Sequence, residues 1–341
     1  MGKIKVGVIG CGSIAQHRHI PEYVANEHVQ VTAFCDVKEE RAQKYAEHFN
    51  AKAYTSYEEL LKDGDVDAIS VCTPNVLHAP ITIAALQAGK HVLCEKPMAT
   101  SKKEAEAMIE AAEKSGKKLM IAHNQRFVAS HQKARSIIES GVLGKIYSFR
   151  TAFGHGGPEG WSVDGTNSWF FKKELAFIGA MGDLGVHKTD LLRYLLGEEF
   201  VEVAAFVESS AKENSTVDDN AVCVLKSESG VIGTLAASWA YNGGEDNSTV
   251  FYAENGIMRL EDDPDYSLII QYKNGNSERH SLGAIQSNEE GKQTNSRVVE
   301  QFINSILEDT TPPVCGNEGK KSLQVILAAL ESSETKRTVR I

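Results

Sequence analysis

The sequence lacks the features that mark membrane proteins and nucleic-acid-binding proteins. No apolar run reaches the ~20 residues that a helix needs to cross a bilayer. The formal net charge of −10 argues against nucleic acid as a partner, because binding to phosphates requires a basic face. The first residues, MGKIKVGVIG, lead directly into an apolar segment and leave no room for a signal peptide. We therefore expect a cytoplasmic protein that binds neither membranes nor nucleic acid.

Cysteine is sparse and scattered as well. None of the six cysteines belongs to a Cys-x-x-Cys pair, which fits a reducing compartment better than a disulfide framework. The sequence has no internal repeat and no low-complexity tract. With 341 residues, of which 42% are hydrophobic, the chain is long enough to form two domains with separate cores.

A nucleotide-binding pattern stands at the start of the chain. Residues 5–15, KVGVIGCGSIA, form a short apolar run that is followed by Gly10, Gly12 and Ala15. This is typical of a buried strand that turns tightly into a helix, whose free N–H groups can bind a pyrophosphate. A second apolar run ends at Asp36, where a carboxylate can accept hydrogen bonds from a ribose. The spacing predicts a dinucleotide site.

The residues around Asp36 bear on the choice of cofactor. The carboxylate favours NAD, because it would repel the 2′-phosphate of NADP. Lys38 and Arg41 lie just beyond it and leave NADP as the alternative.

The periodicity of apolar residues divides the chain in two. Residues 1–124 alternate between apolar strands and amphipathic helices, which predicts an α/β domain with a doubly wound parallel sheet of the Rossmann type. Residues 125–341 predict an α+β domain. Its helix at 180–196 precedes consecutive strands over 201–282, which indicate a large, open, mainly antiparallel sheet. Turn signals at 228–230, 242–244, 254–256 and 273–275 predict hairpins.

Polar residues follow three of the predicted strands of the first domain. They are Thr73, Pro74, Asn75 and His78 after one strand, Glu95 and Lys96 after the next, and Asn124 and Arg126 after the last. In such sheets ligands bind at the carboxyl ends of the strands. A charged pair next to a buried strand is unfavourable unless it faces a cleft or a partner, so we expect Glu95 and Lys96 to face a cleft. The alternative is that Lys96 is an ordinary lysine in a solvated loop.

A fourth cluster lies on the predicted helix over 180–196. Asp183 and His187 are one helical turn apart, and an aspartate next to a histidine fixes its tautomer and stabilises a general base. An ion pair on the helix surface and a divalent-metal pair are the alternatives. A metal requires a third convergent ligand, which the sequence does not supply, so we expect no metal. Three glycines on these turns, Gly179, Gly182 and Gly185, indicate close approach to the backbone.

Taken in order, the motifs resemble the Gfo/Idh/MocA family of nicotinamide-dependent sugar and cyclitol oxidoreductases. The motifs are GCGSIA, Asp36, TPN with His78, CEKP, HNQRF and G-x-x-x-D-x-G-x-H. The resemblance implies oxidation of a secondary hydroxyl of a sugar, glycoside or inositol-like cyclitol to a ketone, or the reverse reaction. It also implies that Lys96 binds the reacting hydroxyl, that His187 is the general acid/base and that Asp183 contacts the substrate. A cis peptide bond between Lys96 and Pro97 is a further implication.

The resemblance also assigns residues to the cofactor. These are Gly10, Gly12, Ser13, Ile14, Asp36, Thr73, Pro74, Asn75, His78, Glu95, Lys96, Asn124 and Arg126. Arg126 is expected at the cleft between the domains, within reach of the substrate as well.

A loop rich in glycine and aromatic residues, over 154–171, offers further substrate contacts. Its His155, Trp161, Asn167 and Trp169 could line a sugar site, since aromatic faces and hydrogen-bonding side chains suit polyols. The alternative is that the aromatic residues pack the domain. Tyr241 is a weaker candidate.

Two other functions remain open from the sequence. One is an NAD-requiring glycosidase on the same fold, and the other is a sensor that binds NAD without catalysis. The open sheet of the second domain presents a face that must be covered, and the resemblance implies a homodimer or homotetramer through it.

Overall fold

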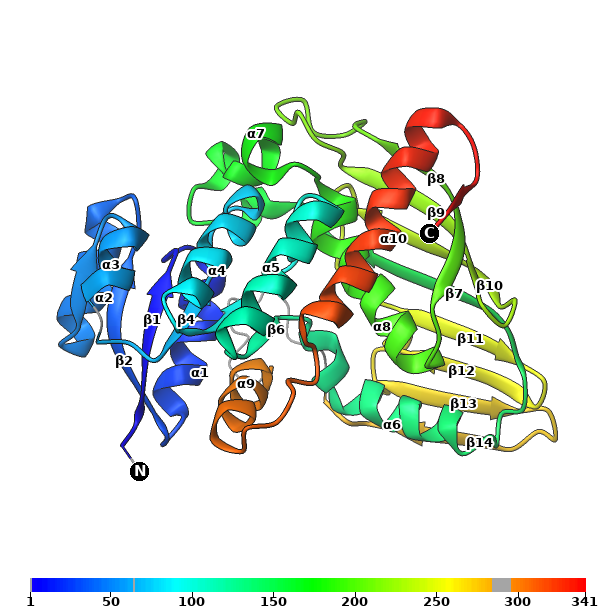
Figure 1. Cartoon of the computed structure of the whole chain (residues 1–341). Coiled ribbons are helices and arrows are strands. Elements are labelled where there is room, and N and C mark those ends of the chain that lie inside the picture. The colour runs from blue at the N-terminus through cyan, green and yellow to red at the C-terminus, as the bar shows by residue number, and fades with distance from the viewer. Residues whose placement is uncertain (1, 64, 284–295) are drawn as a thin grey trace.

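The structure is a computed structural model that describes residues 2–63, 65–283 and 296–341. Two sheets, each with its own hydrophobic core, lie next to each other (Figure 1). The first sheet is parallel and has the strand order β3-β2-β1-β4-β5-β6. Its strands are β1 (Ile4–Ile9), β2 (Val29–Cys35), β3 (Lys52–Tyr54), β4 (Ala68–Val71), β5 (His91–Cys94) and β6 (Leu119–Ile121). The predicted doubly wound sheet is confirmed.

Helices cover both faces of this sheet. In Figure 1, α4 and α5 lie along one face, and α1 and α9 lie along the other. The helices of this part are α1 (Ile20–Ala25), α2 (Glu39–Phe49), α3 (Tyr57–Asp63), α4 (His78–Gln87) and α5 (Lys102–Ser115). Because both faces are covered, β1, β4 and β5 are apolar along almost their whole length and buried.

The second sheet has nine strands in the order β14-β13-β12-β11-β7-β10-β9-β8-β15. They are β7 (Ile146–Gly154), β8 (Phe200–Glu208), β9 (Asn220–Ser227), β10 (Ile232–Ser238), β11 (Thr249–Ala253), β12 (Gly256–Leu260), β13 (Leu268–Tyr272), β14 (Ser277–His280) and β15 (Val339–Arg340). All neighbours pair antiparallel except β7 and β10, which are parallel. The helices α6 (Ala129–Glu139), α8 (Val186–Leu196) and α10 (Gly316–Thr335) cover one face (Figure 1).

One predicted hairpin is wrong. The segment 242–244 joins β10 to β11, but these strands are not neighbours, because β7 lies between them in the sheet. The turn signals at 228–230, 254–256 and 273–275 do correspond to turns between paired strands. The residues of this turn could not reveal that β7, a strand from much earlier in the chain, lies between β10 and β11 in the sheet.

The chain returns to the first domain near its end. Four buried apolar residues of α9 (Val298–Leu307) belong to the core around the first sheet: Val298, Val299, Phe302 and Ile303. Before this helix, the amide and hydroxyl groups of Ser296 donate to Glu22 Oε1 on α1. A division into 1–124 and 125–341 remains our prediction for the two folding units, with α9 packed on the first.

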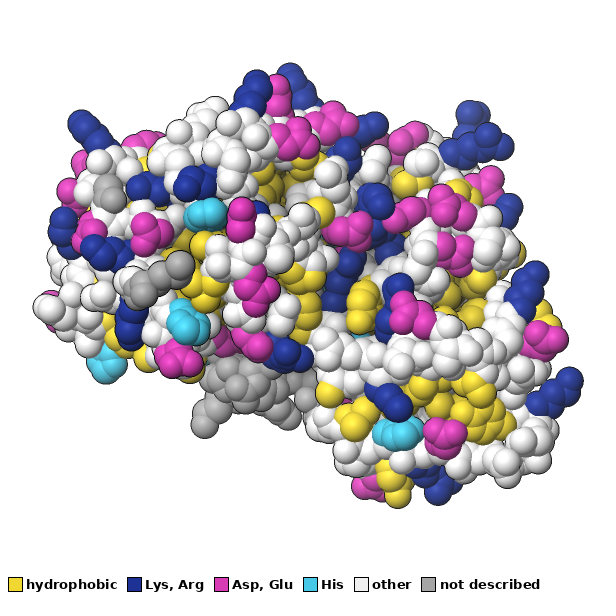
Figure 2. Space-filling model, turned by 60° about the horizontal axis from the view of Figure 1, so that its bottom comes forward, with side chains coloured by type: hydrophobic (Ala, Val, Ile, Leu, Met, Phe, Trp, Pro, Cys, Tyr) yellow, Lys and Arg dark blue, Asp and Glu magenta, His cyan; other side chains and the backbone are white. Residues whose placement is uncertain are grey.

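The surface carries charges of both signs. On the face drawn in Figure 2, acidic and basic side chains are interspersed over both parts of the molecule. None of the described helices is both long and apolar enough to span a membrane.

Candidate active site between the two sheets

A cavity of about 740 Å³ lies where the carboxyl ends of the first sheet face the second domain. Most of the predicted site residues line it. They are Gly10, Gly12, Ser13, Ile14, Asp36, Thr73, Pro74, Asn75, His78, Glu95, Lys96, Asn124, His155, Trp161, Asn167, Trp169, Asp183 and His187. We call this cavity the cleft.

The Gly-rich turn leaves the backbone open at one end of the cleft. Gly10 has a φ of +91°, and a Cβ there would lie 2.5 Å from the carbonyl oxygen of Cys72, so only glycine fits. A Cβ at Gly12 would meet no atom within 4 Å. The backbone at Gly12 is therefore accessible from the cleft, as close contact with a pyrophosphate requires.

Asp36 is held at the end of β2 by two backbone groups. Its Oδ2 accepts from the amide of Cys11 at 2.8 Å, and its Oδ1 accepts from the amide of Lys38 at 2.9 Å. A carboxylate oxygen can accept a second hydrogen bond, so Asp36 retains capacity for a ribose hydroxyl. The turn and this carboxylate fit the pyrophosphate and adenosine ribose of NAD.

The ammonium of Lys96 lies deeper in the cleft. Its Nζ donates to Oδ1 of Asp183 at 2.7 Å and to the carbonyl oxygen of Asp183 at 2.9 Å. Lysine has a third N–H, which makes no hydrogen bond to any described residue and can bind a ligand. The other carboxylate oxygen of Asp183 accepts from Nε1 of the buried Trp239 at 3.2 Å. The peptide bond between Lys96 and Pro97 is cis, as expected.

His187 is a buried, neutral imidazole next to this pair. Burial and the charge of Lys96 hold the pKa of His187 well below its usual value, with a further contribution from His123. The two imidazole rings lie 6.4 Å apart, and Phe153 packs on the other side at 5.8 Å. Among the described residues, none makes a hydrogen bond to Nδ1 of His187. A neutral ring with a free nitrogen can accept a proton.

The predicted contact between Asp183 and His187 does not form. Asp183 instead binds Lys96 and Trp239. The reason is local, because residues Met181–Gly185 form a π-helical turn before α8. The wider i→i+5 spacing rotates Asp183 relative to its place in an α-helix, so residues four apart no longer stack. A second π-helical turn, Ala15–His19, follows the Gly-rich turn and continues directly into α1.

Glu95 is a buried carboxylate with two basic partners that the sequence analysis missed. Its Oε1 accepts from Arg18 at 2.5 Å and lies 2.8 Å from Nε2 of His19, whose other nitrogen contacts Ser70 at 2.6 Å. Burial by itself would raise the pKa of Glu95, but Arg18 and His19 hold it well below its usual range. The available signal was a pair of basic residues directly after the Gly-rich turn.

Asp218 fixes the segment that carries Asp183. Its carboxylate accepts from the amides of Gly179 at 2.7 Å and Met181 at 2.8 Å. A Cβ at Gly179 would lie only 1.8 Å from the carbonyl oxygen of Asp218, so the close backbone approach predicted at these glycines is confirmed. The partner Asp218 was not predicted, since no local pattern links two segments so far apart.

Two other predicted residues join loops across the cleft. The ring of His78 bridges two strand-end loops, with Nδ1 2.7 Å from the carbonyl oxygen of Pro97 and Nε2 2.9 Å from that of Thr73. The amide of Asn75 donates to the carbonyl oxygen of Ala176, in the second domain, at 2.8 Å. These contacts set the shape of the cleft.

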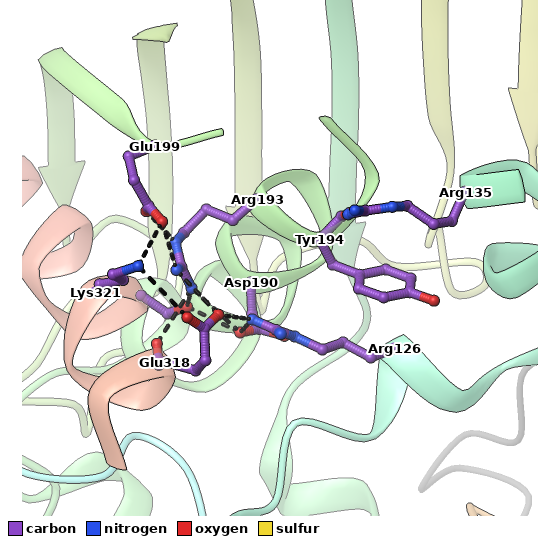
Figure 3. A network of polar contacts seen from close by, with 9 residues as sticks. Arg126, Arg135, Asp190, Arg193, Tyr194, Glu199, Glu318 and Lys321 are labelled. Carbon is purple, nitrogen blue, oxygen red and sulfur yellow. Dashed lines mark hydrogen bonds and ion pairs between the residues drawn. The ribbon is translucent and has the colours of Figure 1, made fainter. Parts of the chain in front are cut away.

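Arg126 and Tyr241 do not lie where the sequence analysis expected. In the short 3-10 turn Asn124–Phe127, Asn124 lines the cleft, whereas Arg126 is not among the lining residues and binds Asp190 (Figure 3). Tyr241 is not among the cleft residues, and its ring packs against Gly154. A role for Arg126 at the cofactor or substrate is therefore not supported by its position.

Comparisons with known proteins agree with this geometry. Residues 4–123 match the family model described as "Oxidoreductase family, NAD-binding Rossmann fold", and residues 131–259 match the GFO/IDH/MocA C-terminal domain. The chain belongs to the Gfo/Idh/MocA family. It is therefore an oxidoreductase that uses NAD.

Gfo/Idh/MocA relatives match along most of the chain. Myo-inositol 2-dehydrogenase of Thermotoga maritima is 28% identical over 99% of this chain and 98% of its own length. The 1,5-anhydro-D-fructose reductase of Ensifer adhaerens is 33% identical over 74% of this chain and 71% of its own length. Both are named for reactions on cyclitols or sugars.

Solved Gfo/Idh/MocA structures show the same fold. Levoglucosan dehydrogenase in complex with NADH and levoglucosan superposes with a TM-score of 0.87, at 25% identity and 99% coverage of both chains. The aldose-aldose oxidoreductase of Caulobacter crescentus, complexed with glycerol, has a TM-score of 0.85 at 28% identity, covering 99% of this chain and 100% of its own.

Proposed function

We propose that the protein oxidises one secondary hydroxyl of a sugar, glycoside or inositol-like cyclitol to a ketone with NAD, or catalyses the reverse reduction. One observation carries the proposal: the ammonium of Lys96 and the neutral imidazole of His187 both line the cleft that begins at the Gly-rich turn. Within the described part of the chain, one N–H of this ammonium and Nδ1 of this imidazole have no partner. Hydride transfer from an alcohol requires a group that holds the oxygen and a base that takes its proton.

In this mechanism Lys96 and His187 divide the work on the hydroxyl. The remaining N–H of Lys96 donates to the hydroxyl oxygen, and Asp183 keeps the ammonium in place. His187 accepts the hydroxyl proton as the carbonyl forms. Bound NAD supplies the hydride acceptor. Because the pKa of His187 is lowered, the base stays deprotonated at neutral pH, and kcat/KM for oxidation should fall only in acid, well below pH of about 6.5.

The loop over 154–171 supplies the proposed sugar contacts. Trp161 packs edge-on against Phe170 at 5.1 Å, and Trp169 stacks on the same ring at 3.9 Å. His155 lies next to Trp161 at 6.4 Å. These residues pack against one another and also line the cleft, so they can both stabilise the domain and contact a sugar.

The test is NADH formation by the purified protein with a panel of cyclitols, glucosides and anhydrosugars. We expect turnover with at least one of them, and a loss of about 10³-fold in kcat for His187→Gln, since general bases contribute about 10²–10⁴-fold. The surface variant His48→Gln is the matched control and should keep full activity. Free sugar released without net NADH would indicate the glycosidase, and NADH binding without turnover of any compound would indicate the sensor.

A homodimer or homotetramer through the open sheet is the proposed assembly. Its outward face exposes Phe206 by 67%, Val222 by 48% and Val224 by 45% on neighbouring strands β8 and β9. Light scattering after size-exclusion chromatography should give an oligomer that dissociates in Phe206→Asp. We retain the cytoplasm as the proposed compartment, since all six cysteines are free and five of them are buried.

A further inference from the structure

The loop over 154–171 is fastened to the Gly-rich turn of the first domain. The hydroxyl of Ser13, in that turn, donates to the carbonyl oxygen of Trp161 at 3.2 Å and accepts from the amide of Val163 at 2.9 Å. A segment of the substrate domain therefore lies directly over the place where the cofactor's pyrophosphate and ribose are expected.

The next residue of the loop, Asp164, forms ion pairs with both cations that follow Asp36. Its Oδ1 lies 2.6 Å from Nζ of Lys38 and 2.7 Å from an Nη atom of Arg41, and its Oδ2 accepts from the other Nη atom at 3.3 Å. The hydrogen bond from Arg41, supported by the charge of Lys38, lowers the pKa of Asp164 against a smaller effect of burial. The carboxylate is therefore ionised at neutral pH.

We infer that Asp164 makes the enzyme select NAD over NADP by occupying Lys38 and Arg41. In Rossmann folds the 2′-phosphate of NADP takes the place next to the carboxylate at the end of the second strand, and a neighbouring arginine accommodates it. Asp36, Lys38 and Arg41 alone would carry a net charge of +1 there, with an arginine fork free for the phosphate. Asp164 brings this net charge to zero and accepts hydrogen bonds from both Nη atoms of Arg41, which would otherwise bind the phosphate.

Two consequences separate this role from simple repulsion by Asp36. Removal of the Asp164 charge should increase NADPH affinity even though Asp36 is still present. The increase should also depend on Lys38 and Arg41, because these cations would be the phosphate ligands. The inference rests on the use of NAD and on no particular substrate.

The experiment is calorimetric titration of NADH and NADPH into the purified protein and its Asp164→Asn variant. We expect the ratio of NADPH to NADH affinity to rise by about 10-fold, which corresponds to about 1.4 kcal/mol. Adding Lys38→Met and Arg41→Met should abolish the gain. Glu159→Gln, which removes another paired carboxylate of the same loop, is the control and should leave the ratio unchanged.

Three results would overturn the inference. They are an unchanged affinity ratio in Asp164→Asn, a gain that persists without Lys38 and Arg41, and a loss of both cofactors, which would mean that Asp164 only holds the loop. Failure of the proposed function has a different signature. In that case the wild type binds NADH and shows the expected selectivity, yet oxidises no sugar or cyclitol.

Discussion

Two clusters of buried charges join segments of the chain that are far apart, and they differ in how completely their hydrogen-bonding groups are used. In the cleft, Lys96 binds Asp183 but keeps one N–H, and His187 next to it has a free nitrogen among the described residues. In the second cluster, Arg126 binds both oxygens of Asp190 at 2.7 Å and also contacts Glu318 at 2.9 Å (Figure 3).

Further ion pairs and hydrogen bonds complete the second cluster. Arg193 binds both oxygens of Glu199, at 2.6 and 2.9 Å, and contacts Glu318 at 3.1 Å. Ser322 of α10 donates to Asp190. The charges of Arg126, Asp190, Arg193, Glu199 and Glu318 thus pair with one another and connect α8 to α10 (Figure 3). Burial and charge are common to both clusters, so we infer that the unused hydrogen-bonding capacity of Lys96 and His187 marks the cluster able to do chemistry.

The largest effect is expected for Lys96→Met. The variant keeps the length of the side chain but removes the ammonium, so kcat/KM should fall by about 10³-fold, as for the loss of one transition-state donor. Initial rates of NADH formation measure this. Lys102→Met, at an exposed lysine, is the matched control and should keep full activity. If Lys96→Met retained more than a tenth of wild-type activity, Lys96 would not take part in the chemistry as proposed.

Arg126→Met should act on stability instead. Removing Arg126 takes away the nearest cation of the buried Asp190 and leaves it with Arg193 at 3.7 Å, so the free energy of unfolding should fall by about 3 kcal/mol. Denaturant unfolding measures the change, and Arg297→Met, which breaks a pair about half exposed on the surface, should change it by less than about 1 kcal/mol. Loss of activity in a fully folded Arg126→Met protein would place this residue in the chemistry after all.

Trp239→Phe tests how Asp183 and its partner Lys96 are held in position in the cleft. The substitution removes the hydrogen bond from Nε1 to Asp183 and retains an aromatic ring in the core. We expect kcat to fall by about 10-fold, because one neutral donor to a charged group is worth about 1.5 kcal/mol. The affinity for NADH, followed by calorimetry, should stay unchanged. A parallel loss of NADH affinity would instead indicate general damage to the fold.

The last effect concerns stability rather than activity, at a buried histidine outside the cleft. Burial, with the charge of Lys188, lowers the pKa of His131 to about 3. The unfolded chain binds a proton at this residue below pH of about 6.5, whereas the folded chain does not, so stability falls as pH falls, by about 1.4 kcal/mol per pH unit. His131→Gln should therefore show a shallower loss between pH values of about 6 and 4. An unchanged slope would mean that His131 titrates normally in the folded protein.

Much of the first domain could be predicted from the sequence, because its signals are local. The apolar runs before Gly10 and Asp36 form the strands β1 and β2, and the residues named at the strand ends line the cleft, with the exception of Arg126. Parallel strands bring their carboxyl ends to one edge, so sequence order alone placed Thr73 near Lys96.

The supporting residues could not be predicted, because they act across long distances in the chain. Glu95 accepts a hydrogen bond from Arg18, Asp183 accepts one from Trp239, and Lys38 donates one to Asp164. None of these pairs has a periodic or spacing signal. The π-helical turn before α8 was missed for a related reason, since Asp218 and close packing at the glycines shape it.

A crystal structure of the protein with NADH and a polyol that it oxidises would test the joint action of Lys96 and His187 directly. We expect one hydroxyl oxygen of the polyol to lie within about 3 Å of both Lys96 Nζ and a ring nitrogen of His187, the distance that proton transfer requires. A polyol bound with its hydroxyl groups out of reach of either residue, while the nicotinamide lies in the cleft, would contradict it.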